Sequence, residues 1–294
     1  MATLRAIRRR IKSIQSISQV TRAMEMIAAS KMRRAQLATL ASRPYAEKAA
    51  EILSYVAAQP GRSKSVHPLL EQRSQVKNIQ IVLITSDRGL CGAFNVNIIR
   101  KANDSIAAQK KPARLIAIGK RGRDYAARHG KNLIAEFSGL SERPTIAQIG
   151  PIATVAIDEF VSGKVDEVYI AYTDFENVLR QHPTIKRLLP IQAPTEEHRG
   201  AGAVYLYEPD PEALLNSILP RFTELIIYQT LLESVASEHS ARMVAMRNAT
   251  ENAHELIDGL TLAMNKARQT SITKEMLDIA GGAEALTKSL EAKQ

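Results

Sequence analysis

The stretch from residue 210 to residue 286 constrains the fold more than any other part of the sequence. Asp210 followed by Pro211 is a typical helix start, because the Asp side chain accepts from free backbone N–H groups and Pro fits the first helical position. The paired glycines at 281 and 282 predict the end of this helix. A helix of this span measures on the order of 100 Å. No single domain of this size buries such a helix along its whole length.

Apolar and small residues recur along this stretch in alternating steps of three and four. This heptad spacing is typical of a helix that packs against a partner helix. Polar residues interrupt the same register at Gln229, His239, Thr250 and Ser271. The predicted seam consists of Leu215, Ile218, Phe222, Leu225, Leu232, Ala236, Met243, Met246, Ala253, Ile257, Leu260, Met264 and Ala267.

The N-terminal segment, residues 1–57, supplies the partner as a second amphipathic helix. Its seam is expected to slip by one position after Ile14, which lets the apolar stripe drift around the helix. The later seam residues are small and bury little area, so this part of the interface should be weakly held. Pro44 is expected to kink the helix or to begin a new turn. The predicted seam is Leu4, Ile7, Ile11, Ile14, Ile17, Val20, Met24, Ile27, Ala28, Ala35 and Ala38.

The same segment is strongly basic and holds no acidic residue before Glu25. Three interpretations compete. A transit peptide is Arg-rich, but its pattern would not continue into a heptad seam. A nucleic-acid arm lacks aromatic residues for stacking until Tyr45, and the third interpretation is a solvated or protein-facing side of a coiled-coil helix. The basic residues are Arg5, Arg8, Arg9, Arg10, Lys12, Arg22, Lys31, Arg33 and Arg34.

Composition limits the class of protein. A hydrophobic content of 45% is that of a globular chain, and the net charge of +10 indicates an acidic partner without specifying its kind. The single cysteine, Cys91, excludes an intrachain disulfide and fits a reducing compartment. No uncharged apolar run approaches the roughly 20 residues of a membrane span.

The middle of the chain predicts a three-layer α/β domain, because short β-branched runs alternate with helical patterns. Strands are expected at 78–86, 114–119, 133–137 and 165–173, with antiparallel edge strands at 178–189 and 203–207. The predicted organisation is an N-terminal helix over 1–58, a linker over 59–75, a Rossmann-like domain over 76–208, a C-terminal helix over 209–286 and a tail over 287–294.

This domain shows no convincing active site. The loop after the first strand has neither GxGxxG nor a Walker motif. Gly119 and Gly122 flank basic residues at a strand-to-helix junction, where they serve either a phosphate or a tight turn. Cys91 lies near Arg88, but no pattern supplies a histidine base. The histidines are scattered without metal-binding spacing: His67, His129, His182, His198, His239 and His254.

Three regions carry a specific pattern. Residues 8–36 read RRRIKSIQSISQVTRAMEMIAASKMRRAQ, residues 84–99 read ITSDRGLCGAFNVNII, and residues 237–257 and 266–286 read SEHSARMVAMRNATENAHELI and KARQTSITKEMLDIAGGAEAL. Together they closely resemble the gamma subunit of F-type ATP synthase. The likeness covers essentially the whole chain. No paired-cysteine insertion of the chloroplast type is present, so the bacterial type without thiol regulation is expected.

The resemblance implies that the terminal helices form a long, left-handed, antiparallel two-helix coiled coil. It also implies that a three-layer, Rossmann-like α/β domain packs beside the lower part of this coiled coil. It implies a central rotor shaft inside a ring of three alpha and three beta subunits, with the epsilon subunit and the membrane c-ring at its foot. Ion flow, of protons or sodium, turns the shaft and drives ATP synthesis or hydrolysis in the beta subunits. We therefore expect no catalytic site, cofactor or metal in this chain.

The resemblance also nominates contact residues, each of which stands against plain helix packing or a solvated surface. Pro220 departs from the family's pattern: it removes one backbone hydrogen bond and is expected to bend the lower part of the C-terminal helix. The candidate contacts to the beta-subunit lever loops are Arg22, Met24, Glu25, Arg242, Arg268, Gln269, Thr273 and Glu275. The candidate apolar bearing tip is Met276, Leu277, Ile279 and Ala280, and the candidate c-ring and epsilon foot is Tyr205, Tyr207 and Glu208.

Two other functions stay open on the residues alone: a basic coiled-coil protein that binds nucleic acid or a membrane surface, and a nucleotide-dependent enzyme. For the rotor function we expect no nucleic-acid partner and no direct membrane span. The motif begins at the initiator Met, so the expected location is peripheral, on the cytoplasmic face of a bacterial plasma membrane. The matrix side of the mitochondrial inner membrane is the alternative.

Overall fold

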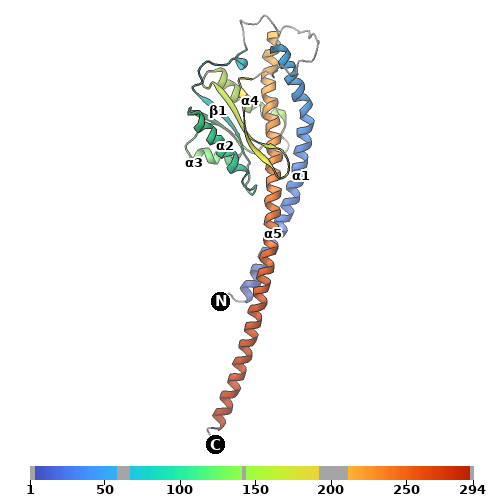
Figure 1. Ribbon diagram of the computed structural model, residues 1–294, viewed down its shortest axis with the longest axis vertical. Coiled ribbons are helices and arrows are strands. Elements are labelled where there is room, and N and C mark those ends of the chain that lie inside the picture. Colours follow the sequence, from blue (N-terminus) through green and yellow to red (C-terminus); the bar gives the residue numbers. More distant parts are fainter. Residues whose placement is uncertain (1–3, 58–66, 141–143, 192–210, 292–294) are drawn as a thin grey trace. The chain divides into compact units, whose positions relative to one another are not determined.

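The computed structural model describes residues 4–57, 67–140, 144–191 and 211–291. Two long helices enclose an α/β domain in the sequence (Figure 1). The elements in chain order are α1 (Leu4–Ala57), the 3-10 helix η1 (Pro68–Leu70), β1 (Ile79–Ile84), α2 (Phe94–Gln109), β2 (Ala113–Ile118), α3 (Lys120–Arg128), β3 (Asn132–Phe137), α4 (Ile146–Val161), β4 (Glu167–Phe175), β5 (Gln181–Leu189) and α5 (Pro211–Glu291).

The five strands form one sheet in the order β3-β2-β1-β4-β5. β1 pairs in parallel with β2 and β4, β2 pairs in parallel with β3, and β5 is antiparallel to β4. Every residue of β1 is buried, as expected for a central strand covered on both faces. The predicted α/β architecture with a mainly parallel sheet is confirmed. The predicted strand at 203–207 lies outside the described residues.

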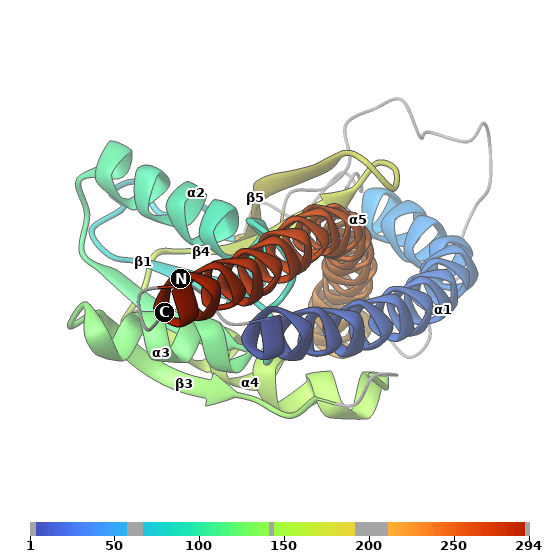
Figure 2. The ribbon, with the colours of Figure 1, turned by 90° about the horizontal axis from the view of Figure 1, so that it is seen from below.

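Helices cover both faces of the sheet. On one face, Ile81 and Leu83 of β1 pack with Ile98 of α2 and Ala126 of α3. On the other face, side chains of β1, β2 and β4 pack with α4, η1 and α5. The part of α5 beside the sheet can be followed from two directions (Figure 1, Figure 2). It contributes the buried side chains Leu219, Ile227 and Leu231 to this core.

The chain divides into two compact units. One contains Met1–Met26 and Met246–Gln294, and is called the helix-pair unit below. The other contains Ile27–Ala245 and is called the α/β unit. Both α1 and α5 contribute residues to each unit, so each unit is described by itself.

The helix-pair unit is held by polar contacts between α1 and α5. Ser18 Oγ lies 3.4 Å from His254 Nε2, and Thr21 Oγ1 lies 2.7 Å from Thr250 Oγ1. Arg247 Nε donates to Glu25 Oε1 at 2.9 Å. Residue numbers rise along α1 as they fall along α5, so the two helices are antiparallel here.

The predicted slip in the seam of α1 is wrong. Ile17 and Val20 are 53% and 58% exposed, whereas Ser18 is 6% exposed and Thr21 is half-buried. The heptad register of Ile11 and Ile14 therefore continues without interruption. The apolar pattern misled the prediction because Ser18 and Thr21 find hydrogen-bonding partners on α5, which makes their burial tolerable.

The C-terminal helix does not stop at the paired glycines. Helix α5 passes through Gly281 and Gly282 and ends at Glu291. Glycine lowers helix propensity by about 1 kcal/mol relative to Ala but does not forbid the helix, and good helix formers follow it. Pro220 also lies inside α5, and Pro44 lies inside α1. Each proline removes one backbone donor, and the bend at Pro220 stays a prediction.

Candidate functional site

The carboxyl edge of the sheet, where α/β folds bind nucleotides, is filled by the protein's own groups. The first turn of α3 offers its backbone N–H groups to Asp87 and its neighbours instead of to an anion. The Asp87 carboxylate therefore takes the place that a phosphate occupies at a helix N-terminus. The bonds are Lys120 N to Asp87 Oδ1 (2.9 Å), Arg121 N to Ser86 O (3.1 Å), Gly122 N to Thr85 Oγ1 (2.8 Å) and Gly139 N to Asp87 Oδ2 (2.9 Å).

Close packing explains the two glycines at this junction. Gly119 has φ +92°, and a Cβ there would lie 2.2 Å from the carbonyl oxygen of Thr85. A Cβ on Gly122 would lie 2.9 Å from Thr85 Oγ1. Since α3 must begin against the end of β1, only glycine fits. Of the two interpretations left open by the sequence, the geometry favours the turn over the phosphate site.

Cys91 has the properties of a structural cysteine. Its side chain is 2% exposed, and Asn95 Nδ2 donates to its Sγ at 3.2 Å. Burial raises the pKa of the Cys91 thiol. A nucleophilic cysteine needs the opposite shift and access to substrate. This residue therefore contributes to packing in the loop after β1.

In the described part of the chain, no group of three or more His, Cys, Asp or Glu side chains is placed to hold a metal ion. None of the helices described combines the length and the apolar character that a membrane span needs.

Arg242, a candidate partner contact, is engaged inside the α/β unit. Its side chain is 11% exposed, and its Nη2 lies 2.8 Å from Glu238 Oε1. The same guanidinium lies 3.2 Å from His239 Nδ1 and donates to the carbonyl oxygens of Arg88 and Gly89 at 3.4 and 3.3 Å. In this arrangement Arg242 fastens the loop after β1 to α5, and its contact with a beta subunit stays a prediction.

The Glu238 carboxylate loses solvation in this arrangement. Burial raises the pKa of its carboxyl, and Asp87 raises it further, while Arg242 and Lys31 lower it. The net shift is upward, so desolvation outweighs the ion pair. Sequence reasoning missed Glu238, because a glutamate one turn before an arginine is a common surface pair.

The remaining lever candidates fall at two separate levels of the helix-pair unit. Arg22 is exposed, Met24 is half-buried, and Glu25 pairs with Arg247. Because Ser18 lies opposite His254, the same offset places Leu4 level with Arg268. The candidates from Gln269 to Glu275 therefore extend past the start of α1 and do not join Arg22 in one cluster.

The far end of α5 presents apolar side chains to solvent. Met276, Leu277 and Ile279 are 65%, 67% and 74% exposed, and Ala280 is exposed as well. The polar groups just before them bond locally, with Thr273 Oγ1 donating to Gln269 O at 3.0 Å. A run of exposed apolar side chains is typical of a surface that another protein covers.

The predicted foot cannot be placed. Tyr205, Tyr207 and Glu208 lie outside the described residues.

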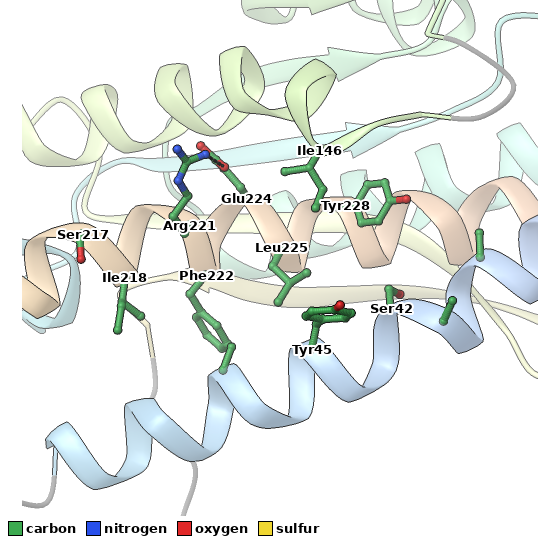
Figure 3. Close-up of a pocket in the computed structure, with 13 residues that line it drawn as sticks. Ser42, Tyr45, Ile146, Ser217, Ile218, Arg221, Phe222, Glu224, Leu225 and Tyr228 are labelled. Atoms are coloured by element: carbon green, nitrogen blue, oxygen red, sulfur yellow. Dashed lines mark hydrogen bonds and ion pairs between the residues drawn. The ribbon is translucent and has the colours of Figure 1, made fainter. Parts of the chain in front are cut away.

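A groove of about 830 Å³ runs between α1 and α5 in the α/β unit. Figure 3 shows Phe222 and Leu225 pointing from α5 toward α1, where Ser42 and Tyr45 lie. The other lining residues of α1 are Ala38, Ala41 and Ala49. Apart from Tyr45, small side chains of α1 face larger ones of α5 across this space, and the weak packing expected of the small-residue seam stays a prediction.

Comparison with known proteins places the whole chain in one family. The family model described as ATP synthase matches residues 3–286. The ATP synthase gamma chain of Dehalococcoides mccartyi strain CBDB1 is 51% identical over 286 residues, which is 97% of this chain and 100% of the relative. The chain belongs to the ATP synthase gamma chain family.

Other gamma chains agree along their full length. That of Chloroflexus aurantiacus strain J-10-fl is 48% identical over 290 residues, which is 98% of this chain and 100% of the relative. Since the match includes both long helices and the α/β unit, the family assignment covers every described element of this gamma chain.

Solved structures support the same fold. A chain in the cryo-EM structure of the Tetrahymena thermophila mitochondrial ATP synthase central stalk and c-ring has a TM-score of 0.61 at 26% identity, covering 78% of this gamma chain and 99% of that chain. A chain in the Euglena gracilis mitochondrial ATP synthase rotor has a TM-score of 0.63 at 18% identity, covering 92% and 98%. At that identity the second match concerns the fold alone.

Proposed function

We propose that this gamma chain is the central rotor shaft of a rotary ATP synthase and couples ion-driven rotation of a c-ring to ATP synthesis or hydrolysis in beta subunits. The observation that carries the proposal is full-length identity of about half to ATP synthase gamma chains. The structural relative at 26% identity supports it, since it comes from a central stalk with its c-ring.

In this proposal the chain itself performs no ATP chemistry. The carboxyl edge of the sheet supports this role, because Asp87 already satisfies the helix terminus that could bind a phosphate. Cys91 supports it too, because burial raises the pKa of its thiol. The partners are three alpha and three beta subunits around the shaft, and an epsilon subunit and the c-ring at its foot.

The proposed contacts to the beta subunits lie at two levels. Arg22, Met24 and Glu25 form the first, beside Arg247. Arg268, Gln269, Thr273 and Glu275 form the second, which begins level with Leu4 and extends past the start of α1. Exposed basic side chains at both levels suit acidic loops of the surrounding ring. Arg242, the remaining candidate, pairs with Glu238 inside the chain, and its contact with a beta subunit stays a prediction.

The proposed bearing tip consists of Met276, Leu277, Ile279 and Ala280. Its exposed apolar side chains would turn inside an apolar sleeve of the ring, where few directional contacts favour one angle over another. Each 1.4 kcal/mol of preference for one angle skews its population about tenfold. An apolar tip suits a rotor because its contacts are nondirectional.

The foot and the location complete the proposal. Tyr205, Tyr207 and Glu208 are proposed to face the c-ring and the epsilon subunit. The chain is then a peripheral protein on the cytoplasmic face of a bacterial plasma membrane, and the relatives from bacteria support this setting.

Reconstitution tests the proposed function directly. Alpha and beta subunits are assembled with and without this chain, and ATP hydrolysis is measured; the complete enzyme in vesicles is assayed for ATP-driven ion pumping. We expect the chain to restore hydrolysis and to be required for pumping. Equal activity without the chain, or turnover of ATP by the chain alone, would contradict the proposal.

A further inference from the structure

Three buried serines follow one face of α5 at intervals of three residues. Ser234, Ser237 and Ser240 are 1%, 0% and 0% exposed. A buried hydroxyl destabilises a fold unless it forms a hydrogen bond. Two of the three form bonds to another element, and Ser234 Oγ has no hydrogen-bonding partner among the described residues.

The two bonded serines hold the hairpin formed by β4, β5 and the turn between them. Ser237 Oγ donates to the carbonyl oxygen of Thr173 at 3.1 Å. The residue opposite Thr173 in the ladder is Pro183, which has no N–H to offer. Pro183 therefore contributes no donor to this part of the ladder, and Ser237 joins β4 to α5 there.

The second serine binds the turn itself. Ser240 Oγ donates to the carbonyl oxygen of Val178 at 2.7 Å. Gln181 Nε2 donates to the same oxygen at 2.8 Å and to Ser240 Oγ at 3.3 Å. The turn is otherwise exposed, since Leu179 beyond it is 81% exposed. β5 is also the edge strand of the sheet, so these bonds join its free end to α5.

Hydrogen bonds give this contact a directional character that apolar packing lacks. Leu219, Ile227 and Leu231 attach α5 to the α/β core through nondirectional contacts. Bonds to fixed carbonyl oxygens depend on distance and angle, so they define how far along its axis and at what rotation the helix sits on the hairpin.

We infer that Ser237 and Ser240 are positioning residues for torque transmission, which fasten the β4–β5 hairpin to α5 so that the helix and the sheet turn together. The inference rests on the proposed rotor function. A force that reaches the sheet then passes to α5 through bonds that resist sliding.

The test compares the double variant Ser237→Ala/Ser240→Ala with Ser234→Ala, which removes a buried hydroxyl from the same helix face without removing a bond. Hydrogen exchange of the backbone amides of residues 175–182 is measured in the whole chain. Both variants are then assembled into the complete enzyme, and ion-driven ATP synthesis is compared with ATP hydrolysis.

We expect exchange in the hairpin of the double variant to be at least about tenfold faster than in Ser234→Ala, from the loss of three hydrogen bonds to the two hydroxyl groups. Ion-driven synthesis should fall relative to hydrolysis in the double variant alone. Where the double variant fails to fold, Ser240→Ala takes its place. A variant with the faster exchange but the synthesis-to-hydrolysis ratio of Ser234→Ala would overturn the inference. Failure of the unaltered chain to support coupled turnover would instead overturn the proposed function.

Discussion

Glu238 and Arg242 form a largely buried ion pair on α5. The surroundings of the Glu238 carboxyl disfavour its charged form. Burial raises the pKa of Glu238 above its ordinary value of 4.5. The folded chain therefore binds this proton more tightly than the unfolded chain, and the associated stability is complete below pH 4.5 and is lost as pH rises through the folded pKa. We expect the melting temperature of the unaltered chain, relative to Glu238→Gln, to fall as pH rises from about 4.5 toward neutral.

Thermal unfolding of the isolated chain over a pH series measures this difference. Glu251→Gln, at an exposed position of the same helix, is the control for a general effect of removing a carboxylate. The opposite result would be a melting temperature of the unaltered chain that rises relative to that of Glu238→Gln toward neutral pH. That result would show that the ion pair outweighs desolvation.

Gly119 is a second residue whose environment fixes its identity. Gly119→Ala would place a Cβ 2.2 Å from a backbone carbonyl at φ +92°. We expect a loss of about 2 kcal/mol or more in the free energy of unfolding, because the new Cβ would clash with the backbone carbonyl oxygen and carbon of Thr85, which cannot swing away as a flexible side chain can. Gly130→Ala is the control, since its φ is +58° and its Cβ would meet nothing within 4 Å. Denaturant titrations that give equal losses for both variants would contradict the packing explanation.

At the scale of the element, the register of α1 decides which side chains hold the helix pair. Ile14 is half-buried on the seam, and Ile17 is 53% exposed beside it. We expect Ile14→Ala to destabilise the helix-pair unit by about 1 kcal/mol or more, from lost apolar burial. Ile17→Ala should cost no more than the usual 0.5 kcal/mol or so of a surface substitution. Amide exchange in residues 4–26 of the two variants measures this, and a larger effect for Ile17→Ala would restore the slipped seam.

The seam also shows where sequence reasoning on these helices reached its limit. The central strand β1 is predicted to within a few residues, because a buried parallel strand is a continuous apolar run. Ile17 and Val20 suggested a slip because an apolar side chain was assumed to be buried. Ser18 and Thr21 are buried instead, and their partners His254 and Thr250 lie more than 200 positions away. Local pattern cannot supply such partners.

At the scale of the whole molecule, the family was recognisable from the sequence, whereas the placement of its contact residues was not. Arg242 and Arg268 lie in similar basic motifs of α5. The structure commits Arg242 to Glu238 and two loop carbonyls, and leaves Arg268 exposed. The difference comes from the loop after β1, which reaches α5 only in the folded chain. A sequence motif describes both arginines in the same way, because it holds no information on the contact between Arg242 and the loop after β1.

Arg22 and Arg268 offer a test of the rotor as a whole. Thr21 lies opposite Thr250, so about 18 residues of α5 separate the two levels, which is roughly 27 Å along the helix. If each arginine meets acidic loops of the catalytic ring at its own level, Arg22→Glu and Arg268→Glu should each reduce ATP-driven ion pumping by the reconstituted enzyme. Sites so far apart act independently, so the fractional losses should multiply in the double variant. Arg100→Glu, at an exposed position of α2, controls for the change in net charge. Normal pumping by both single variants would show that charge attraction at these two positions does not contribute to torque. The torque would then depend on the shape of the shaft.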